Sequence, residues 1–308
     1  MSGIGVVPLK IQRFRLTFYA VEAISFSSFP GAAFRGVFGH GLKRATCLYG
    51  GRDCHGCVAR SGCAYPRLFE AEVVSQGRKK TIPLPLVFDF SRVGQHVEVE
   101  QRFTIDCTLL GQVGEQAELV FVAWEIAGQL GVGGKFSRFE LVDIVELDAP
   151  DRQQLTMTCS DHQIRECHLQ LVTPFCTRRR TGRKRIDVGP NEFEVGPYLM
   201  NILRRRKELE QWYGEYDPSV AQGDEAFNMT HLTELVYGLK VVSRSLQSLE
   251  YKRKSFRQDR YLTIRGVVGD IRIRGDRLSE LLPLLWQGQW LHVGNNTSQG
   301  CGQYRLTI

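Results

Sequence analysis

The strongest constraint on the fold is an internal repeat, which places the same series of elements in each half of the sequence. In the first half, a helix predicted over residues 116–130 is followed by a glycine-rich segment and an aliphatic strand, residues 131–141. In the second half, a helix predicted over residues 277–286 precedes a longer glycine-rich segment and a similar strand, residues 291–306. A repeat of this kind predicts two copies of one structural unit.

The beginnings of the two halves correspond as well. Residues 9–20 alternate apolar and polar at several steps, which predicts a strand. A turn then opens a predicted helix over residues 32–46, although Gly36, Gly39 and Gly41 each weaken it by ~1 kcal/mol relative to alanine. Glycines at these positions permit the close approach of another backbone or of a ligand.

We therefore predict an α+β fold built from two β-α-β-β-α-β units. The expected domains are residues 1–150, with a cysteine-rich insertion at about 47–63, and residues 151–308, joined by a linker at 148–151. The other elements on which this division rests are a strand at 103–109, a strand at 167–173 and a helix at 198–212.

The composition is that of a soluble globular protein, with 43% hydrophobic and 24% charged residues. No apolar run approaches the ~20 residues that a bilayer-spanning helix needs, so we expect no membrane contact. The first ten residues lack the pattern of a secretory signal. We expect a cytoplasmic protein whose nine cysteines stay reduced.

Positive charge is concentrated in the second half of the sequence. Forty Lys and Arg residues against 33 Asp and Glu give a formal charge of +7. Clustered cations displace counterions from a polyanion, which favours RNA or DNA binding over the alternative of solvated loops. The clusters are Arg178, Arg179, Arg180, Arg183, Lys184 and Arg185; Arg204, Arg205, Arg206 and Lys207; and Lys252, Arg253, Lys254, Arg257 and Arg260.

Four cysteines, Cys47, Cys54, Cys57 and Cys63, fall close together, and the central two have Cys-x-x-Cys spacing. Four thiolates can surround Zn²⁺ tetrahedrally, so we predict a structural zinc site, to which His55 could contribute in place of one cysteine. A metal-free loop and a redox pair are the alternatives. We expect no metal or other cofactor in catalysis, because no cluster of carboxylates or histidines offers an open coordination position.

The segment 131–135 superficially resembles a nucleotide-binding loop. A phosphate loop requires Gly-x-x-x-x-Gly-Lys-Ser/Thr, but Gln129 and Phe136 occupy two of the required positions. A dinucleotide-binding loop requires a strand before the glycines and a helix after them, and here the order is reversed. Both nucleotide-binding functions are excluded on these grounds.

Together these features resemble the CRISPR-associated endoribonucleases of the RAMP superfamily that process precursor CRISPR RNA. The similarity extends over nearly the whole chain. The passages that carry it are residues 29–40, 64–70, 131–141, 171–174, 203–209, 212–214 and 251–306.

The resemblance implies tandem ferredoxin-like (RRM-like) domains that bind CRISPR repeat RNA, retain the mature product and join other Cas proteins in an effector complex. It also implies metal-independent cleavage within the repeat. The ribose 2′-hydroxyl would attack the phosphate and leave a 2′,3′-cyclic phosphate. The alternatives are a noncatalytic RNA-binding subunit of a CRISPR complex and, more remotely, a zinc-stabilised binding module unrelated to CRISPR.

For catalysis the resemblance points to His40, because many members carry a histidine on or just after the first helix. Lys43 would neutralise the scissile phosphate and Tyr19 would orient the hydroxyl, whereas a surface lysine and a core tyrosine are the alternatives. The residues predicted to bind RNA are Arg35, Arg178, Arg179, Arg180, Arg183, Lys184, Arg185, Arg204, Arg205, Lys252, Arg253, Lys254, Arg257, Asn295, Asn296 and Ser298.

Overall fold

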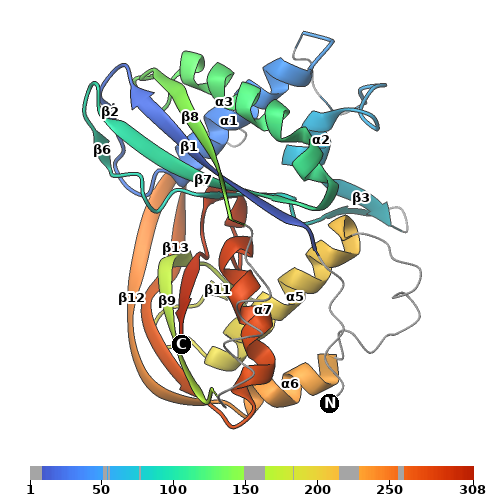
Figure 1. The fold of residues 1–308 in the computed structure, drawn as a ribbon, viewed down its shortest axis with the longest axis vertical. Helices are drawn as coiled ribbons and strands as arrows, with labels where there is room; N and C mark the ends of the chain where they lie inside the picture. Colours follow the sequence, from blue (N-terminus) through green and yellow to red (C-terminus); the bar gives the residue numbers. More distant parts are fainter. Residues whose placement is uncertain are drawn as a thin grey trace. The chain divides into compact units, whose positions relative to one another are not determined.

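The computed structural model divides into two compact units, and Figure 1 shows the chain coloured along its sequence. One unit spans Lys10–Leu147 and the other contains Leu9 and the described residues from Asp148 onward. This division falls beside the expected linker at 148–151, of which only Asp148 is described. The structure describes residues 9–50, 54, 56–75, 78–148, 164–182, 184–214, 229–255 and 260–308.

The first unit has a four-stranded antiparallel sheet with the order β5-β7-β1-β8, and helices α1 and α3 cover one face of it (Figure 1). Its elements are β1 (Ile11–Ala20), β2 (Ile24–Ser25), α1 (Gly31–Thr46), α2 (Ala64–Phe69), β3 (Glu72–Ser75), β4 (Arg78–Thr81), β5 (Leu86–Asp89), β6 (His96–Val97), β7 (Arg102–Leu110), η1 (Gly111–Gln116), α3 (Ala117–Leu130) and β8 (Phe139–Leu147).

An aromatic core joins these helices to the sheet. Phe18 of β1 lies 5.3 Å from Trp124 of α3, and Phe38 of α1 lies 5.1 Å from the same ring, measured between centroids. All three side chains are fully buried. Burial of aromatic surface of this size is a dominant source of stability.

Two glycines allow α1 to pack closely against its neighbours. A Cβ atom at Gly41 would lie 2.1 Å from the carbonyl oxygen of Ala123 in α3. A Cβ atom at Gly39 would lie 2.3 Å from the ring of Phe69 in α2. The predicted close approach of another backbone is thus confirmed at Gly41, and α1 is held from two sides.

The second unit repeats this plan, with an antiparallel sheet of order β12-β13-β9-β14 and with α5 and α7 packed on one face. Its elements are β9 (Glu166–Phe175), β10 (Arg178–Thr181), β11 (Lys184–Asp187), α5 (Val195–Tyr213), α6 (Met229–Tyr237), β12 (Lys240–Ser255), β13 (Arg260–Arg274), α7 (Leu278–Leu291), η3 (Thr297–Gln299) and β14 (Tyr304–Thr307).

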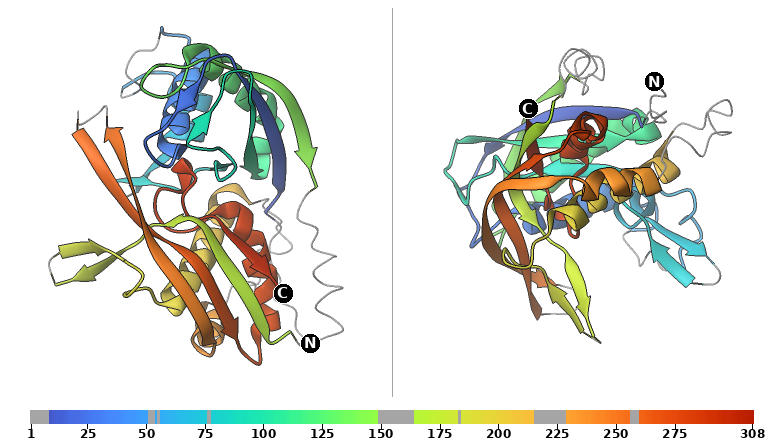
Figure 2. Two further views of the ribbon diagram at one scale, coloured as in Figure 1. Left: turned by 90° about the vertical axis from the view of Figure 1, so that its left-hand side faces the viewer. Right: turned by 90° about the horizontal axis from the view of Figure 1, so that it is seen from below.

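The main elements of both units follow the order strand, helix, strand, strand, helix, strand, and in each sheet the strands lie in the spatial order second, third, first, fourth. The predicted α+β class and the predicted repeat are therefore confirmed. Parts of the second unit lie outside the shared plan. The short β10–β11 hairpin projects away from the sheet (Figure 2), and the first part of β13 extends beyond its pairing with β9.

Candidate functional site

His40 lies on the exposed face of α1. Its neighbours Gly39 and Gly41 are buried, because α2 covers the first and α3 covers the second. Gly36 and Arg44 are also exposed and lie one turn before and one turn after His40, on the same face of the helix. The imidazole is therefore accessible to a ligand while the helix that carries it is firmly packed.

Arg44, which the sequence analysis missed, is the positively charged residue that lies on the same face of α1 as His40. Arg44 is exposed and four positions from His40, whereas Lys43 is half-buried and its ammonium nitrogen lies 5.7 Å from the centroid of the Tyr65 ring. Lys43 thus points toward α2. The signal for Arg44 was its spacing, since residues four apart in a helix face the same way.

Tyr19 is not brought together with His40. Along β1 the side chains of Phe18 and Ala20 are buried against the helices, and successive strand residues point to opposite faces. Tyr19 therefore points away from α1. Removal from water, together with the charges of Glu100 and Glu140 and a hydrogen bond to Glu100, raises the pKa of the Tyr19 phenol. This placement argues against the catalytic role that we predicted for Tyr19.

Arg35 holds α2 against α1. The central carbon of its guanidinium group lies 4.1 Å from the centroid of the Phe69 ring, and Nη2 donates a hydrogen bond to the Phe69 carbonyl oxygen at 3.4 Å. A guanidinium group stacked on an aromatic ring in this way is a packing element. The structure therefore favours a structural role for Arg35 over the predicted contact with RNA.

The β10–β11 hairpin presents exposed arginines. Arg178, Arg179, Arg180 and Arg185 are all exposed, and Arg178 is paired with Asp187 at 2.7 Å. Arg180 and Arg185 are direct cross-strand partners. Like charges placed opposite each other are destabilising unless an anion lies between them. The predicted residue Arg183 lies outside the described residues, and the side chain of Lys184 is not described.

The arginines of α5 face different environments. Arg204 is exposed. Arg205 donates a hydrogen bond from Nε to the Leu291 carbonyl oxygen at 2.7 Å, and burial lowers its pKa to about 10. Arg206 is buried and paired with Glu210 at 2.8 Å. Of the two residues predicted to bind RNA here, Arg204 is exposed, whereas Arg205 is half-buried and its guanidinium group is held by the Leu291 carbonyl oxygen.

The basic cluster near residue 252 lies on the long β12–β13 hairpin. Lys252 is exposed and pairs with Thr263, in the part of the hairpin that extends beyond β9. The side chains of Arg253 and Lys254 are not described, and Arg257 lies outside the described residues.

The C-terminal glycine-rich loop packs against the end of β9, immediately before the arginine hairpin. The Asn295 amide donates to the Cys176 carbonyl oxygen at 2.7 Å, and Thr173 Oγ1 donates to the Gly300 carbonyl oxygen at 2.8 Å. A Cβ atom at Gly294 would lie 2.5 Å from the Cys176 carbonyl oxygen. Asn295 is exposed, while Asn296 and Ser298 are half-buried. The loop is thus a tight turn that leaves at least one side-chain amide accessible beside the hairpin.

The four cysteines of the loop between α1 and α2 line one cavity of about 600 Å³. Lys43 and Arg60 lie in the same wall, and Cys54 and Cys63 also pack against the core of the first unit. In the described part of the chain, no three His, Cys, Asp or Glu side chains could hold a metal ion as they stand. His55 lies outside the described residues.

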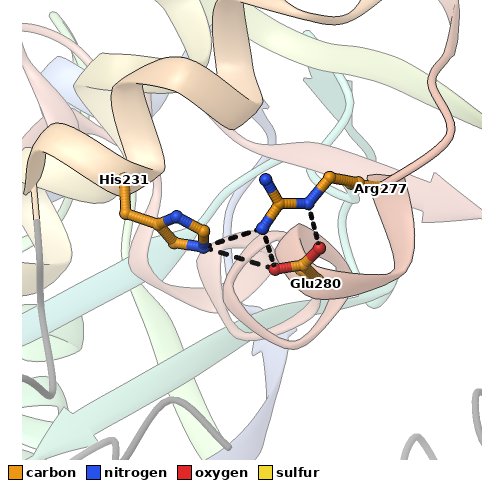
Figure 3. A network of polar contacts seen from close by, with 3 residues as sticks. All are labelled: His231, Arg277 and Glu280. Atoms are coloured by element: carbon orange, nitrogen blue, oxygen red, sulfur yellow. Dashed lines mark hydrogen bonds and ion pairs between the residues drawn. The ribbon is translucent and has the colours of Figure 1, made fainter. Parts of the chain in front are cut away.

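A polar network missed by the sequence analysis joins α6 to the start of α7 (Figure 3). Arg277 Nε donates to Glu280 Oε1 at 2.5 Å, and His231 Nε2 lies 3.3 Å from Glu280 Oε2. These hydrogen bonds, from Arg277 first, lower the pKa of the Glu280 carboxyl. The network links α6 to the first turn of α7 within the second unit. The histidine beside the glycine-rich loop, His292, is buried and is therefore not available as a catalyst.

Comparisons with known proteins give a family match for each half of the chain. None of the helices in the described residues is long and apolar enough to span a membrane. Residues 9–169 match the family described as AF_1859_N, N-terminal domain, and residues 169–304 match the CRISPR-associated endoribonuclease Cas6 family. The chain is 24% identical over 285 residues to an uncharacterized protein of Archaeoglobus fulgidus, covering 90% of this chain and 91% of that one.

Solved structures resemble the whole chain in fold. A Cas6 product complex matches with a TM-score of 0.59 and 14% identity, over 96% of this chain and 99% of that chain. A Cas6-related protein from Pyrococcus furiosus matches with a TM-score of 0.51 and 12% identity, over 97% of this chain and 99% of that chain. The similarity thus covers both units.

Proposed function

We take as our premise that this chain is a CRISPR-associated, Cas6-type protein whose first half belongs to the AF_1859 N-terminal domain family, and we propose that it is an endoribonuclease that cuts precursor CRISPR RNA within its repeats. The exposed imidazole of His40 is the observation that carries the catalytic part of this proposal.

The reaction needs few groups from the protein, because RNA carries its own nucleophile. His40 would act as the general base that accepts the proton of the ribose 2′-hydroxyl. Attack of the 2′-oxygen on the adjacent phosphorus would break the bond from phosphorus to the 5′-oxygen, which takes a proton from water or from the protonated imidazole, and would give a 2′,3′-cyclic phosphate and a free 5′-hydroxyl with no metal required. Arg44, one turn from His40, would stabilise the negative charge that develops on the phosphate.

The repeat RNA would be held mainly by the second unit. The exposed arginines of the β10–β11 hairpin supply positive charge, and Asn295 supplies a side-chain amide beside the base of that hairpin. An RNA phosphate placed between Arg180 and Arg185 would relieve the repulsion between them. Guanidinium groups fork onto phosphate oxygens, which favours contact with the RNA backbone. We propose that the cleaved product remains bound here and that other Cas proteins join it.

The finer assignment of the fold follows from the same premise. We propose that both units are ferredoxin-like domains, which the shared element order and strand order support. We also propose that the loop between α1 and α2 is a zinc-binding insertion in the first of them, which the shared cysteine cavity supports.

The test is cleavage of a repeat RNA from the same genome by the purified protein in EDTA. We expect one cut with a 2′,3′-cyclic phosphate end, and a loss of ~100-fold or more in the single-turnover rate for His40→Ala. Full activity of His40→Ala would remove this residue from catalysis and leave the family assignment intact.

A second candidate function is a noncatalytic subunit that binds CRISPR RNA. The position of Tyr19, on the face of the sheet opposite α1, favours it, because His40 then lacks the tyrosine that we had predicted to orient the 2′-hydroxyl. This function predicts tight, salt-sensitive binding of the repeat with no cleavage under any condition.

A further inference from the structure

The loop between α1 and α2 brings a complete set of soft metal ligands to one place. Cys47 is the first residue after α1, and its amide donates to the Lys43 carbonyl oxygen at 2.9 Å. Cys63 is the residue immediately before α2. Cys54 and Cys57 lie between them and are linked by a backbone hydrogen bond of 3.4 Å. All four side chains are half-buried and line the same cavity.

The donor chemistry of this cavity selects one class of ligand. Its other walls come from aliphatic, aromatic, hydroxyl and cationic side chains, so thiols are the metal-binding groups of its described lining. Four thiolates bind Zn²⁺ in a tetrahedron with sulfur–metal distances of ~2.3 Å. As they stand in the described residues, no three of these side chains could hold an ion, so binding requires the cysteine side chains to turn into the cavity that they surround.

Two cations of the same cavity match the charge that such a site would carry. One Zn²⁺ with four thiolates has a net charge of −2, and burial of that charge needs compensation. Lys43 and Arg60 both line the cavity. Arg60 is held there by a hydrogen bond from Nη1 to the Cys54 carbonyl oxygen at 3.2 Å. Lys43 is held over the ring of Tyr65.

We propose that Cys47, Cys54, Cys57 and Cys63 bind one zinc ion that fastens the end of α1 to the start of α2, with Lys43 and Arg60 offsetting the charge of the thiolates. This assigns Lys43 to the metal site instead of the scissile phosphate. Zinc binding itself does not depend on the proposed function.

The consequence for catalysis does rest on the proposed function. His40 lies about two helical turns before Cys47, at ~3.6 residues per turn, on the helix that the zinc site would anchor. The contacts of Phe69 with Gly39 and Arg35 already join α2 to the middle of that helix. A zinc ion would join the C-terminal end of α1 to the N-terminal end of α2, and this second connection would fix the position of His40. It would act as a positioning element, because it touches neither substrate nor imidazole.

The first experiment measures metal by inductively coupled plasma mass spectrometry on protein prepared without an immobilised-metal column. We expect one zinc per chain in the wild type and in Cys159→Ser, a cysteine outside the loop, and loss of zinc in Cys47→Ser and Cys63→Ser. Stoichiometric zinc in Cys47→Ser, or folded wild-type protein that takes up no zinc from solution, would overturn the proposal.

Two further measurements keep the test valid where a serine variant does not fold. Cobalt(II) added to demetallated wild-type protein should give the intense sulfur-to-cobalt absorption of a tetrahedral thiolate site, and absence of that band counts against the proposal. Lys43→Gln should weaken zinc binding by ~10-fold, because substitution of a residue beside the metal ligands typically lowers metal affinity. The matched variant Arg44→Gln should bind zinc as the wild type does.

Stability and activity separate this proposal from the enzymatic one. Complete removal of zinc, confirmed by metal analysis, should lower the melting temperature of the wild type and slow single-turnover cleavage without abolishing it, with RNA affinity unchanged, so that cleavage in EDTA remains the expected result of the functional test. If His40→Ala is inactive but removal of zinc changes neither the melting temperature nor the cleavage rate, the proposed link between α1 and α2 through zinc is refuted, whereas the proposed nuclease function stands. If zinc stabilises the chain but no variant cuts RNA, the nuclease is refuted and the zinc site stands.

Discussion

Replacing Gly41 by alanine tests whether the close contact between α1 and α3 holds the helix that carries His40. The new Cβ atom would lie 2.1 Å from the Ala123 carbonyl oxygen and 3.0 Å from the Ala127 amide nitrogen. Both atoms belong to the backbone of α3 and cannot rotate away. The two helices must therefore separate by about 1 Å before ordinary contact distances are restored.

The expected cost follows from two opposing effects. Forcing extra volume into a packed interface costs ~1–3 kcal/mol, and more where backbone must move. Alanine in place of glycine returns ~1 kcal/mol through its higher helix propensity. Because the clash is with backbone atoms of α3, which must move as a unit, we expect Gly41→Ala to lose about 2 kcal/mol of unfolding free energy in the first unit.

Gly36 in the same helix is the matched control, since a Cβ atom there would meet nothing within 4 Å. Gly36→Ala should stabilise the helix by ~0.5–1 kcal/mol. The assay is hydrogen–deuterium exchange of peptides from α1 and α3 across a urea series, which reports this unit separately from the other. Protection of α1 in Gly41→Ala equal to or greater than in the wild type would refute the packing argument.

Three further results are expected from the second unit. The double variant Arg180→Gln, Arg185→Gln should weaken RNA binding and reduce the slope of log affinity against log salt by ~1–2, measured by filter binding at several salt concentrations; an unchanged slope would mean that the hairpin does not meet phosphate. Arg206→Ala should cost ~3–5 kcal/mol in urea unfolding, because the carboxylate of Glu210, whose side chain is 11% exposed, loses the buried guanidinium group that pairs with it at 2.8 Å, and a double variant that also neutralises Glu210 should recover part of it. The pKa of Glu280 is lowered in the folded chain, so its network contributes stability at pH values above the ordinary pKa of 4.5, and this contribution is lost as the pH falls through the folded-state pKa. In Glu280→Gln the melting temperature should therefore fall less steeply at acidic pH than in the wild type. An equally steep fall would argue that the network is not stabilising.

The repeat could be predicted from the sequence because each half carries the same strand, helix and glycine patterns at corresponding places. The strand at 9–20, the helix at 32–46 and the helix at 116–130 correspond closely to β1, α1 and α3. Local spacing sets these elements, and the glycine-rich segments mark where each second helix ends. The β12–β13 hairpin lacked such a signal, since most side chains described along β12 are exposed and show no alternation of buried and exposed positions.

The candidate site was less predictable, because the direction of a side chain depends on its neighbours in space. Strand alternation would have placed Tyr19 opposite Phe18, and helical spacing would have paired His40 with Arg44. No local rule, however, indicates that Arg35 stacks on Phe69 or that Lys43 lies over Tyr65, since both contacts come from the packing of α2 on α1. A run of basic residues indicates that a segment is positively charged, but it does not indicate which group each side chain contacts.

The hydrogen bond from Arg205 to Leu291 bears on how mutational scans of this protein are read. Leu291 is the last residue of α7, and the glycine-rich loop begins immediately after it. An alanine at position 205 would loosen the anchorage of that loop from within the unit. Such a variant would score as defective in RNA binding and would be counted as part of the interface, although its defect would be transmitted through the loop and not through a missing contact with the nucleic acid.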